Sequence, residues 1–236
     1  MKTHRALGWI LPLGCAAWLG ACGGEQPAPQ CAVGRGDHAV RYSLKSGTGI
    51  CAQKKAEIIG AQAFRTPGSG VPPTLVLKPA TLAAWEGKDP AHSVTASGDF
   101  TTEYPGEDGV CVVPSLSEAR QVVSPEPGTT VDVRFLWSNL RIQDQAAIPG
   151  TQWTAELTFS EGDCTATYEA VGVFPAIKCE RDVPNPEDPT KTLKVRDPRV
   201  CKEPKAGLSL DPAFPIVCEE STNLCVLDGQ PPALVP

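Results

Sequence analysis

The sequence predicts an all-β protein, with an antiparallel β-sandwich-like domain followed by an irregular, disulfide-stapled C-terminal extension. Three observations lead to this fold class. Several segments alternate apolar and polar residues with the period of a half-buried strand. An even number of cysteines follows an export signal, and prolines accumulate after Cys179. A single domain is expected, because all-β chains of about this length (236 residues) often form one domain.

The first 21 residues have the pattern of an export signal. Lys2 and Arg5 give a cationic start, and residues 6–19 form an almost uncharged stretch of 14 residues, which is too short to cross a membrane as a helix. Small residues then precede Cys22, and this run resembles a bacterial lipobox. The resemblance implies cleavage after Ala21 and lipid attachment to the Cys22 thiol and the new amine. The alternative is an ordinary secretory signal with a cysteine near its end.

Three acyl chains would hold the protein firmly in a bilayer, because each buried methylene contributes about 0.8 kcal/mol. Gly23 follows the cysteine, whereas Asp at this place is the familiar inner-membrane retention signal of Gram-negative lipoproteins. This resemblance favours the outer membrane, at its periplasmic face or at the cell surface. The polar residues up to Gln30 are typical of a flexible tether. The formal net charge of -6 argues against nucleic acid or an anionic membrane surface as the main partner.

The clearest strand covers residues 131–142. Its apolar residues occupy odd positions up to Trp137 and even positions from Leu140, so a β-bulge is expected near Ser138 and Asn139. Weaker strand signals occur at residues 71–77, 93–102 and 110–113. Residues 54–64 fit a strand or a short helix, and we favour the strand.

Residues 153–170 predict a β-hairpin. Apolar residues take odd positions before residue 161 and even positions after it. A two-residue turn at Glu161 and Gly162 would pair Phe159 with Cys164 and put every apolar side chain on one face. Cys164 would then face the core.

The chain past residue 179 changes in composition. Five prolines lie between residues 180 and 204, which indicates an irregular excursion. Four parts are therefore expected: a signal peptide (1–21), a lipidated cysteine and tether (22–30), a β-domain (31–178) and a Pro-rich stapled extension (179–236).

Eight cysteines remain after processing and lipidation, and an even number in an exported chain indicates disulfides. Neither a metal site nor a cofactor is expected, because the chain has no C-x-x-C pair and the mature part holds two histidines. Sequence alone leaves the connectivity open. If local pairs close first and the two strand cysteines are left to each other, the predicted disulfides are Cys31–Cys51, Cys111–Cys164, Cys179–Cys201 and Cys218–Cys225.

The order of these features resembles the cysteine-rich outer-membrane lipoproteins of myxobacteria. The resemblance rests on the lipobox and on three segments at residues 133–139, 164–168 and 214–218. It implies an envelope location and supplies no catalytic residues.

Residues that could carry chemistry are few, and the common nucleophile and metal motifs are absent from the sequence. A Ser-His-Asp site would have to use His38 or His92, and we read His92 as a loop histidine exposed to solvent. A Ca²⁺ loop or a sugar-stacking platform is possible, but a solvated acidic loop and core tryptophans are favoured. The residues concerned are Asp182, Asn185, Glu187 and Asp188 for calcium, and Trp85, Trp137 and Trp153 for sugar.

We therefore expect a lipid-anchored, non-catalytic binding or structural module that meets envelope proteins or glycans. The alternative is an envelope hydrolase or a glycan-binding accessory protein with an unrecognised site. Strands commit their apolar faces to the core, so binding groups are expected on polar connections. The three candidates are residues 66–70, 86–93 and 144–150.

Overall fold

The computed structural model describes residues 30–66, 69–144, 150–188, 190–202, 210 and 214–229. The predicted signal peptide and Cys22 lie outside these residues. Within the described part, nine strands form one antiparallel sheet in the order β4-β3-β2-β1-β9-β8-β7-β5, with β6 also paired to β7. The strands of this sheet are β1 (Gly36–Gly47), β2 (Glu57–Phe64), β3 (Thr74–Pro79), β4 (Ala96–Asp99), β5 (Val110–Ser115), β6 (Ala119–Val123), β7 (Val131–Gln143), β8 (Gln152–Glu161) and β9 (Cys164–Val173).

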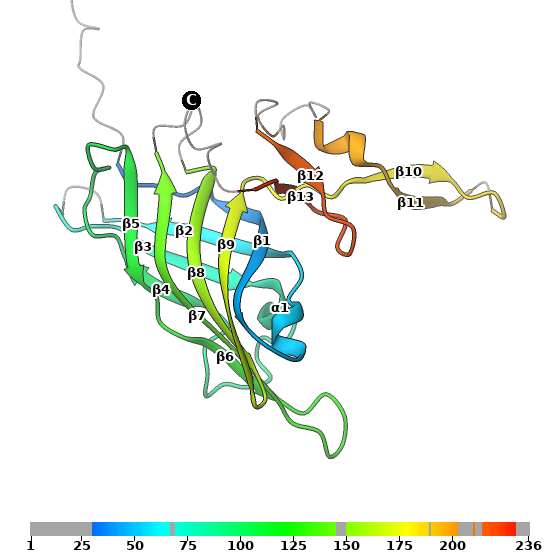
Figure 1. Cartoon of the computed structure of the whole chain (residues 1–236), viewed down its shortest axis with the longest axis horizontal. Helices are drawn as coiled ribbons and strands as arrows, with labels where there is room; N and C mark the ends of the chain where they lie inside the picture. Colours follow the sequence, from blue (N-terminus) through cyan, green and yellow to red (C-terminus); the bar gives the residue numbers. More distant parts are fainter. Residues whose placement is uncertain are drawn as a thin grey trace, which may run out of the picture.

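The sheet is strongly curved, so that strands β1 to β4 cross strands β5 to β9 at a steep angle (Figure 1). Its two ends meet through backbone hydrogen bonds. Thr101 N–H donates to the Val112 carbonyl at 2.9 Å, and Ser117 N–H donates to the Ser97 carbonyl at 2.7 Å. The all-β prediction is confirmed, and the two facing layers come from one barrel-like sheet.

The space between the layers is filled with aromatic side chains. Trp137, Trp153, Tyr168 and Phe135 are fully buried, and the two indole rings meet edge to face at 6.0 Å. Gly172 lies opposite Trp153, where an added Cβ would come within 2.2 Å of the indole. Trp137 and Trp153 are therefore core residues, as the favoured interpretation of the sequence has them.

The predicted β-bulge is confirmed in β7. Ser138 pairs with Glu156 and Arg141 with Thr154, so β7 holds one extra residue between these pairs. Asn139 takes a positive φ of 50°. The bulge restores the inward orientation of the apolar side chains after Trp137.

The β8–β9 hairpin is confirmed, but its predicted turn is wrong by one residue. Glu161 pairs with Cys164, and the turn is made by Gly162 and Asp163. Gly162 has a φ of 58°, and the observed turn puts this glycine at the first central position, where a positive φ is needed. The turn still has two residues, so all the apolar side chains remain on one face.

Of the weaker signals, β2, β3, β4 and β5 confirm strands near the expected places. Two strands, β1 and β6, were not expected from the sequence. In β1 the buried residues His38, Ala39 and Val40 are consecutive, because the extension covers the outer face of the sheet there, and the period-2 pattern is lost. Two short helical segments, η1 (Ile50–Gln53) and α1 (Ala80–Ala83), connect strands. Among the described residues, no helix has the length and apolarity needed to cross a membrane.

The C-terminal extension is more regular than the sequence predicts. It forms two hairpins, β10 (Glu180–Pro184) with β11 (Thr192–Arg196) and β12 (Ile216–Cys218) with β13 (Cys225–Leu227), and a helical turn, η2 (Pro198–Lys202). Pro184 ends β10 and Pro186 lies in the loop, so these prolines flank the ladder and do not interrupt it. The extension packs its own small core against the outer face of β1 and β9, through Ala39, Val171 and Val173.

Candidate functional site

The first described residues, 30–34, form a strap across one end of the curved sheet. Cys31 is bonded to Cys111 of β5, and its N–H donates to the Glu103 carbonyl at 2.9 Å. Arg65, just after β2, donates to the Cys31 carbonyl at 3.0 Å and to Gln30 at 2.9 Å. The strap is therefore held from both halves of the sheet. We call this the strap end, and the opposite end the far end.

The strap also contacts the flanks of the β7–β8 connection. Gly34 N–H donates to the Gly150 carbonyl at 2.8 Å, and Ala32 N–H donates to Asp144 at 3.2 Å. Gly150 has a φ of 74°, and an added Cβ would lie 2.8 Å from the Val33 backbone. Glycine is required there because strap and connection approach so closely. The chain thus enters the domain at one fixed place.

The predicted disulfide pairing is wrong, although all eight cysteines are paired. The observed bonds are Cys31–Cys111, Cys51–Cys164, Cys179–Cys218 and Cys201–Cys225. The sheet brings together residues 80 and 113 positions apart, so sequence proximity does not decide the pairing. Cys218 and Cys225 lie opposite each other in the β12–β13 hairpin, yet each is bonded to a different segment. Two bonds lie in the sheet and two in the extension, and none joins these parts.

His38 is buried and acts as a structural residue. Its Nδ1 accepts a hydrogen bond from Trp153 Nε1 at 3.1 Å, and its Nε2 therefore donates to the Gly34 carbonyl at 2.8 Å. Burial lowers the pKa of His38 to about 4, and the hydrogen bond to Gly34 opposes this shift. The ring is neutral at physiological pH and ties β1 to both the core and the strap.

His92 lies at the far end and is paired with Asp89. Asp89 Oδ2 lies 2.7 Å from His92 Nδ1 and also accepts the Val122 N–H at 2.7 Å. Gln121 donates to the His92 carbonyl at 2.9 Å. This network fixes the 86–93 loop on β6. No serine or cysteine side chain of the described chain hydrogen-bonds to His92.

The acidic residues proposed for calcium shape the β10–β11 loop. Asn185 Oδ1 accepts the Glu187 N–H at 3.0 Å, and Asp188 accepts the Thr190 N–H at 3.1 Å. Asp182 pairs with Lys194 at 3.3 Å. These oxygens are used within the hairpin. The described residues gather possible metal ligands in two places, and both contain cysteines whose sulfurs are already in disulfides.

A buried ion pair inside the sheet was missed by the sequence analysis. Lys54 Nζ lies 2.8 Å from Glu57 and 4.4 Å from the ring centres of Phe135 and Phe159. Tyr42 donates to the same carboxylate at 2.7 Å. Burial, with the adjacent Glu57 charge, raises the pKa of Tyr42 well above its usual value. The rings of Tyr42, Phe135 and Phe159 thus form an aromatic cage, and the Lys54 ammonium group occupies it.

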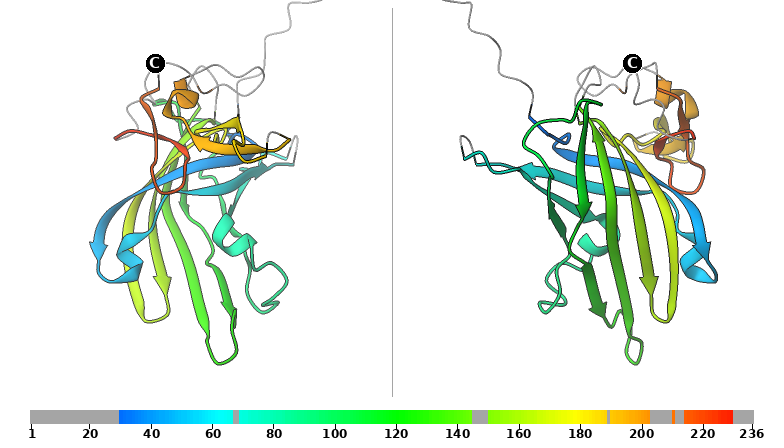
Figure 2. Two further views of the ribbon diagram at one scale, coloured as in Figure 1. Left: turned by 90° about the vertical axis from the view of Figure 1, so that its right-hand side faces the viewer. Right: turned by 60° about the vertical axis from the view of Figure 1, so that its left-hand side comes forward.

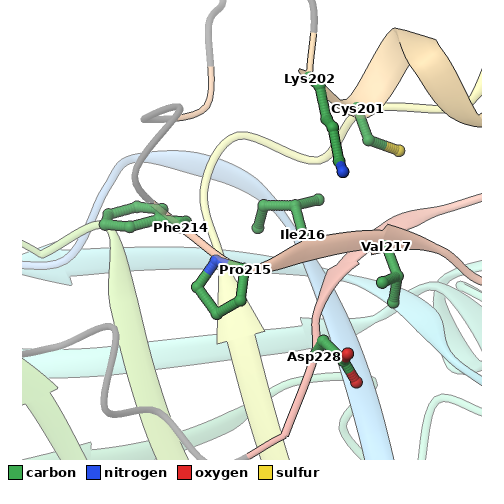
Figure 3. A pocket seen from close by; sticks show the side chains of 7 residues that line it. All are labelled: Cys201, Lys202, Phe214, Pro215, Ile216, Val217 and Asp228. Carbon is green, nitrogen blue, oxygen red and sulfur yellow. The ribbon is translucent and has the colours of Figure 1, made fainter.

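Two hollows in the described surface have lining groups suited to binding. One, of about 330 Å³, lies in the extension between Lys202, Phe214, Ile216 and Asp228 (Figure 3). Asp228 also lies 3.6 Å from Arg41 of β1.

The second hollow, of about 400 Å³, lies at the far end and is lined by Trp85, Lys88 and residues 122–125. An indole ring beside an ammonium group and the Ser124 hydroxyl can hold a sugar ring with an acidic substituent. Of the three predicted binding loops, residues 86–93 border this hollow. The flanks of loops 66–70 and 144–150 lie at the strap end instead.

The comparison with known families agrees with this architecture. The sequence model of the MlpA family matches residues 36–175, more than half of the chain. The chain belongs to the MlpA family. A Myxococcus xanthus protein named "Putative lipoprotein MlpA" is 27% identical over an alignment of 243 residues that covers 95% of both chains. No solved structure matches this chain.

The MlpA match has clear structural limits. It begins at the first residue of β1 and ends two residues after β9, so it corresponds to the curved sheet. The strap, with Cys31, and the extension, with its two disulfides, lie outside the match. The resemblance to myxobacterial lipoproteins predicted from the sequence is confirmed by the family match over the sheet and by the relative that aligns over 95% of the chain.

Proposed function

We propose that this MlpA-family protein is a lipid-anchored, non-catalytic binding module of the cell envelope, attached to the outer membrane through Cys22. The observation that carries the proposal is the position of the lipobox directly before the strap. Only eight residues (23–30) separate Cys22 from Cys31, which is fixed to β5 by a disulfide. The name of the Myxococcus relative supports the same assignment.

The short tether determines which end of the module faces the bilayer. Eight residues span at most about 29 Å when fully extended. The strap end is therefore held close to the membrane, and the far end is turned toward other envelope components. The hollow around Trp85 and Lys88 lies at this far end and is the surface we assign to a glycan or protein partner.

The absence of catalysis is part of the proposal. His38 is buried and neutral, with both ring nitrogens used in structural hydrogen bonds. His92 and Asp89 fix a loop. Among the described residues, no serine or cysteine side chain hydrogen-bonds to either histidine.

Replacement of the acceptor cysteine tests the anchor. Cys22→Ala is expected to accumulate as unprocessed precursor or to appear in the soluble fraction, because no thiol is available for the diacylglyceryl group. Mass spectrometry of the mature N-terminus should find acyl chains on Cys22 in the unmodified protein. Cys15→Ala, a change within the apolar stretch of the signal, is the matched control and should be processed normally. A free amine at another residue would contradict the proposal.

A further inference from the structure

The β10–β11 hairpin is an amphipathic ribbon, and among the described residues its apolar face is left partly exposed. Cross-strand pairing places Val183 opposite Leu193 and Arg181 opposite Val195, so the valines and the leucine share one face. Leu193 is 44% exposed and Val195 47%. The other face carries charges such as the Asp182–Lys194 pair. An isolated two-stranded ribbon is only marginally stable in water, and exposed apolar faces of this kind indicate an interaction surface.

Basic residues of the ribbon are concentrated on β11 and η2, whereas residues 180–202 as a whole hold six Lys or Arg and five Asp or Glu. Residues 190–202 contain five Lys or Arg side chains and one acid. That acid, Asp197, already accepts hydrogen bonds from Arg181 at 2.8 Å and Arg199 at 2.8 Å. Lys191 pairs with Asp188 at 2.9 Å and Lys194 with Asp182 at 3.3 Å, and the two lysine side chains remain 73% and 69% exposed. Apolar and cationic groups therefore occur together on β11 and η2.

The ribbon lies at the strap end of the molecule. It extends sideways from the upper end of the sheet, the same end at which the described chain begins (Figures 1 and 2). Backbone hydrogen bonds fix this arrangement: Phe174 N–H donates to the Thr151 carbonyl, and Ala176 N–H donates to the Asp37 carbonyl, each at 2.7 Å. The chain leaves β9 beside the start of β1. The ribbon is thus attached at the end that the tether holds near the bilayer.

We propose that the Leu193–Val195 face of the ribbon docks on the anionic phospholipid surface in which the lipid anchor is held. The inference rests on the proposed anchor at Cys22. Apolar side chains can enter the interfacial region, while nearby lysines and arginines are attracted to anionic headgroups. Docking would give the module a second membrane contact and fix the direction of its far end. The short tether makes a bilayer the occupant favoured over a soluble protein.

Tryptophan fluorescence on vesicles tests this docking. Acylated protein carrying Leu193→Trp is placed on vesicles of brominated phosphatidylglycerol, and Leu44→Trp is the matched control. Leu44 is 49% exposed and lies toward the far end of β1. We expect bromolipid to quench the tryptophan added at position 193 and not the one at position 44. Thermal melting establishes that both variants are folded.

Charge removal provides the second measurement. In the unacylated mature chain, Lys191→Gln with Lys194→Gln should weaken partitioning into anionic vesicles roughly tenfold or more, since each basic group near such a surface contributes to binding. Partitioning that is unchanged, or equal on zwitterionic vesicles, would overturn the anionic surface as the occupant.

The remaining outcomes separate docking from the anchor. An unquenched probe at position 193 in protein that stays on the vesicles would overturn docking alone. Cross-linking between ribbons of two molecules would identify a second copy as the occupant and also overturn docking. An N-terminus without acyl chains would overturn the proposed anchor, and docking with it.

Discussion

Two ionisable side chains buried near the strap have pKa values displaced in opposite directions. Burial lowers the pKa of His38 to about 4 and raises that of Asp144 to about 6, the latter against weaker opposing effects of the Ala32 N–H and Arg65. Asp144 is 3% exposed, and its Oδ1 has no hydrogen-bond partner among the described residues. As pH falls below 6.5, His38 destabilises the folded state, because the unfolded chain binds the imidazole proton more tightly. Protonation of Asp144 has the opposite effect and stabilises the folded state, because the folded chain binds the carboxyl proton more tightly.

Replacement of Asp144 should therefore stabilise the protein at neutral pH. The folded carboxyl holds its proton more tightly than the unfolded one, so the stability it contributes is present below about pH 4 and is lost as pH rises through 6. From the pKa shift, Asp144→Asn should raise the free energy of unfolding at about pH 7.5 by on the order of 2 to 3 kcal/mol. The difference should disappear below about pH 4, which denaturant titrations at several pH values would show.

Asp132→Asn is the control, and we expect it to change the free energy of unfolding in the opposite direction. Hydrogen bonds from Arg134 and Arg120 lower the pKa of Asp132 well below its usual value, so its loss should destabilise the protein at neutral pH. A lower stability of Asp144→Asn at about pH 7.5 would mean that the Asp144 carboxylate has a stabilising partner.

Breaking the buried Lys54–Glu57 pair should cost far more stability than breaking an ion pair on the surface. Its side chains are 7% and 10% exposed, and Lys54→Met would leave a buried carboxylate with only hydroxyl donors. We expect a loss of about 3 kcal/mol in the free energy of unfolding. The control is Lys45→Met, which removes a pair with side chains 48% and 49% exposed and should cost less than about 1 kcal/mol. Equal losses in the two variants would contradict the buried role of Lys54.

At the scale of elements, the alternation of apolar and polar residues predicted the features that depend only on which face of a strand each side chain takes. The parity of apolar residues located the bulge of β7 and the facing of the β8–β9 hairpin, since both follow from the alternation of side chains along a strand. It did not locate the turn to a single residue, because shifting a two-residue turn by one position preserves parity. The preference of Gly162 for a positive φ was the missing signal.

Features that depend on distant parts of the chain were not predicted. Strand β1 is covered on both faces, by the core and by the extension, so its burial pattern does not alternate. The cysteine pairs follow from the order of strands in the sheet, which the sequence does not reveal. The ion pair of Lys54 depends on aromatic rings from three strands. In the candidate site, the sequence predicted loop 86–93 as a binding loop. Only the fold shows that Lys88 of this loop lines one hollow together with residues 122–125.

Thiol labelling distinguishes the observed disulfides from the pairing predicted by sequence proximity. Cys51→Ala should leave Cys164 as the free thiol, whereas the earlier pairing would free Cys31. Loss of this bond should lower the free energy of unfolding by on the order of 4 kcal/mol, because it closes a loop of 113 residues. Peptide mapping after alkylation under denaturing conditions identifies the labelled cysteine. A label on Cys31 would refute the observed connectivity.

At the scale of the whole molecule, the position of the strap decides which end of the module we expect to face the membrane. The family match covers the curved sheet, while the parts that would meet the membrane, the strap and the ribbon, lie outside it. In the proposed arrangement, attachment lies at the strap end and the hollow around Trp85 and Lys88 lies at the far end.

Partner capture should therefore depend on the far end. Trp85→Ala is expected to lower the affinity for an envelope glycan or protein on the order of tenfold, since loss of an aromatic contact of about 1.4 kcal/mol corresponds to that factor. Tyr104→Ala is the matched control, because Tyr104 is 46% exposed and lies next to Glu103 at the strap end. Pull-down of cross-linked envelope fractions would compare the two variants in their anchored form.

Trp85 also packs partly against the core, so a second variant keeps this prediction independent of folding. Lys88 is exposed and lines the same hollow, and Lys88→Glu should weaken capture of an acidic partner without lowering the melting temperature. Capture that is lost with Tyr104→Ala and retained with both Trp85→Ala and Lys88→Glu would place the binding surface at the strap end. In that case the bilayer and the partner would compete for one side of the molecule, and lipid anchoring would inhibit capture.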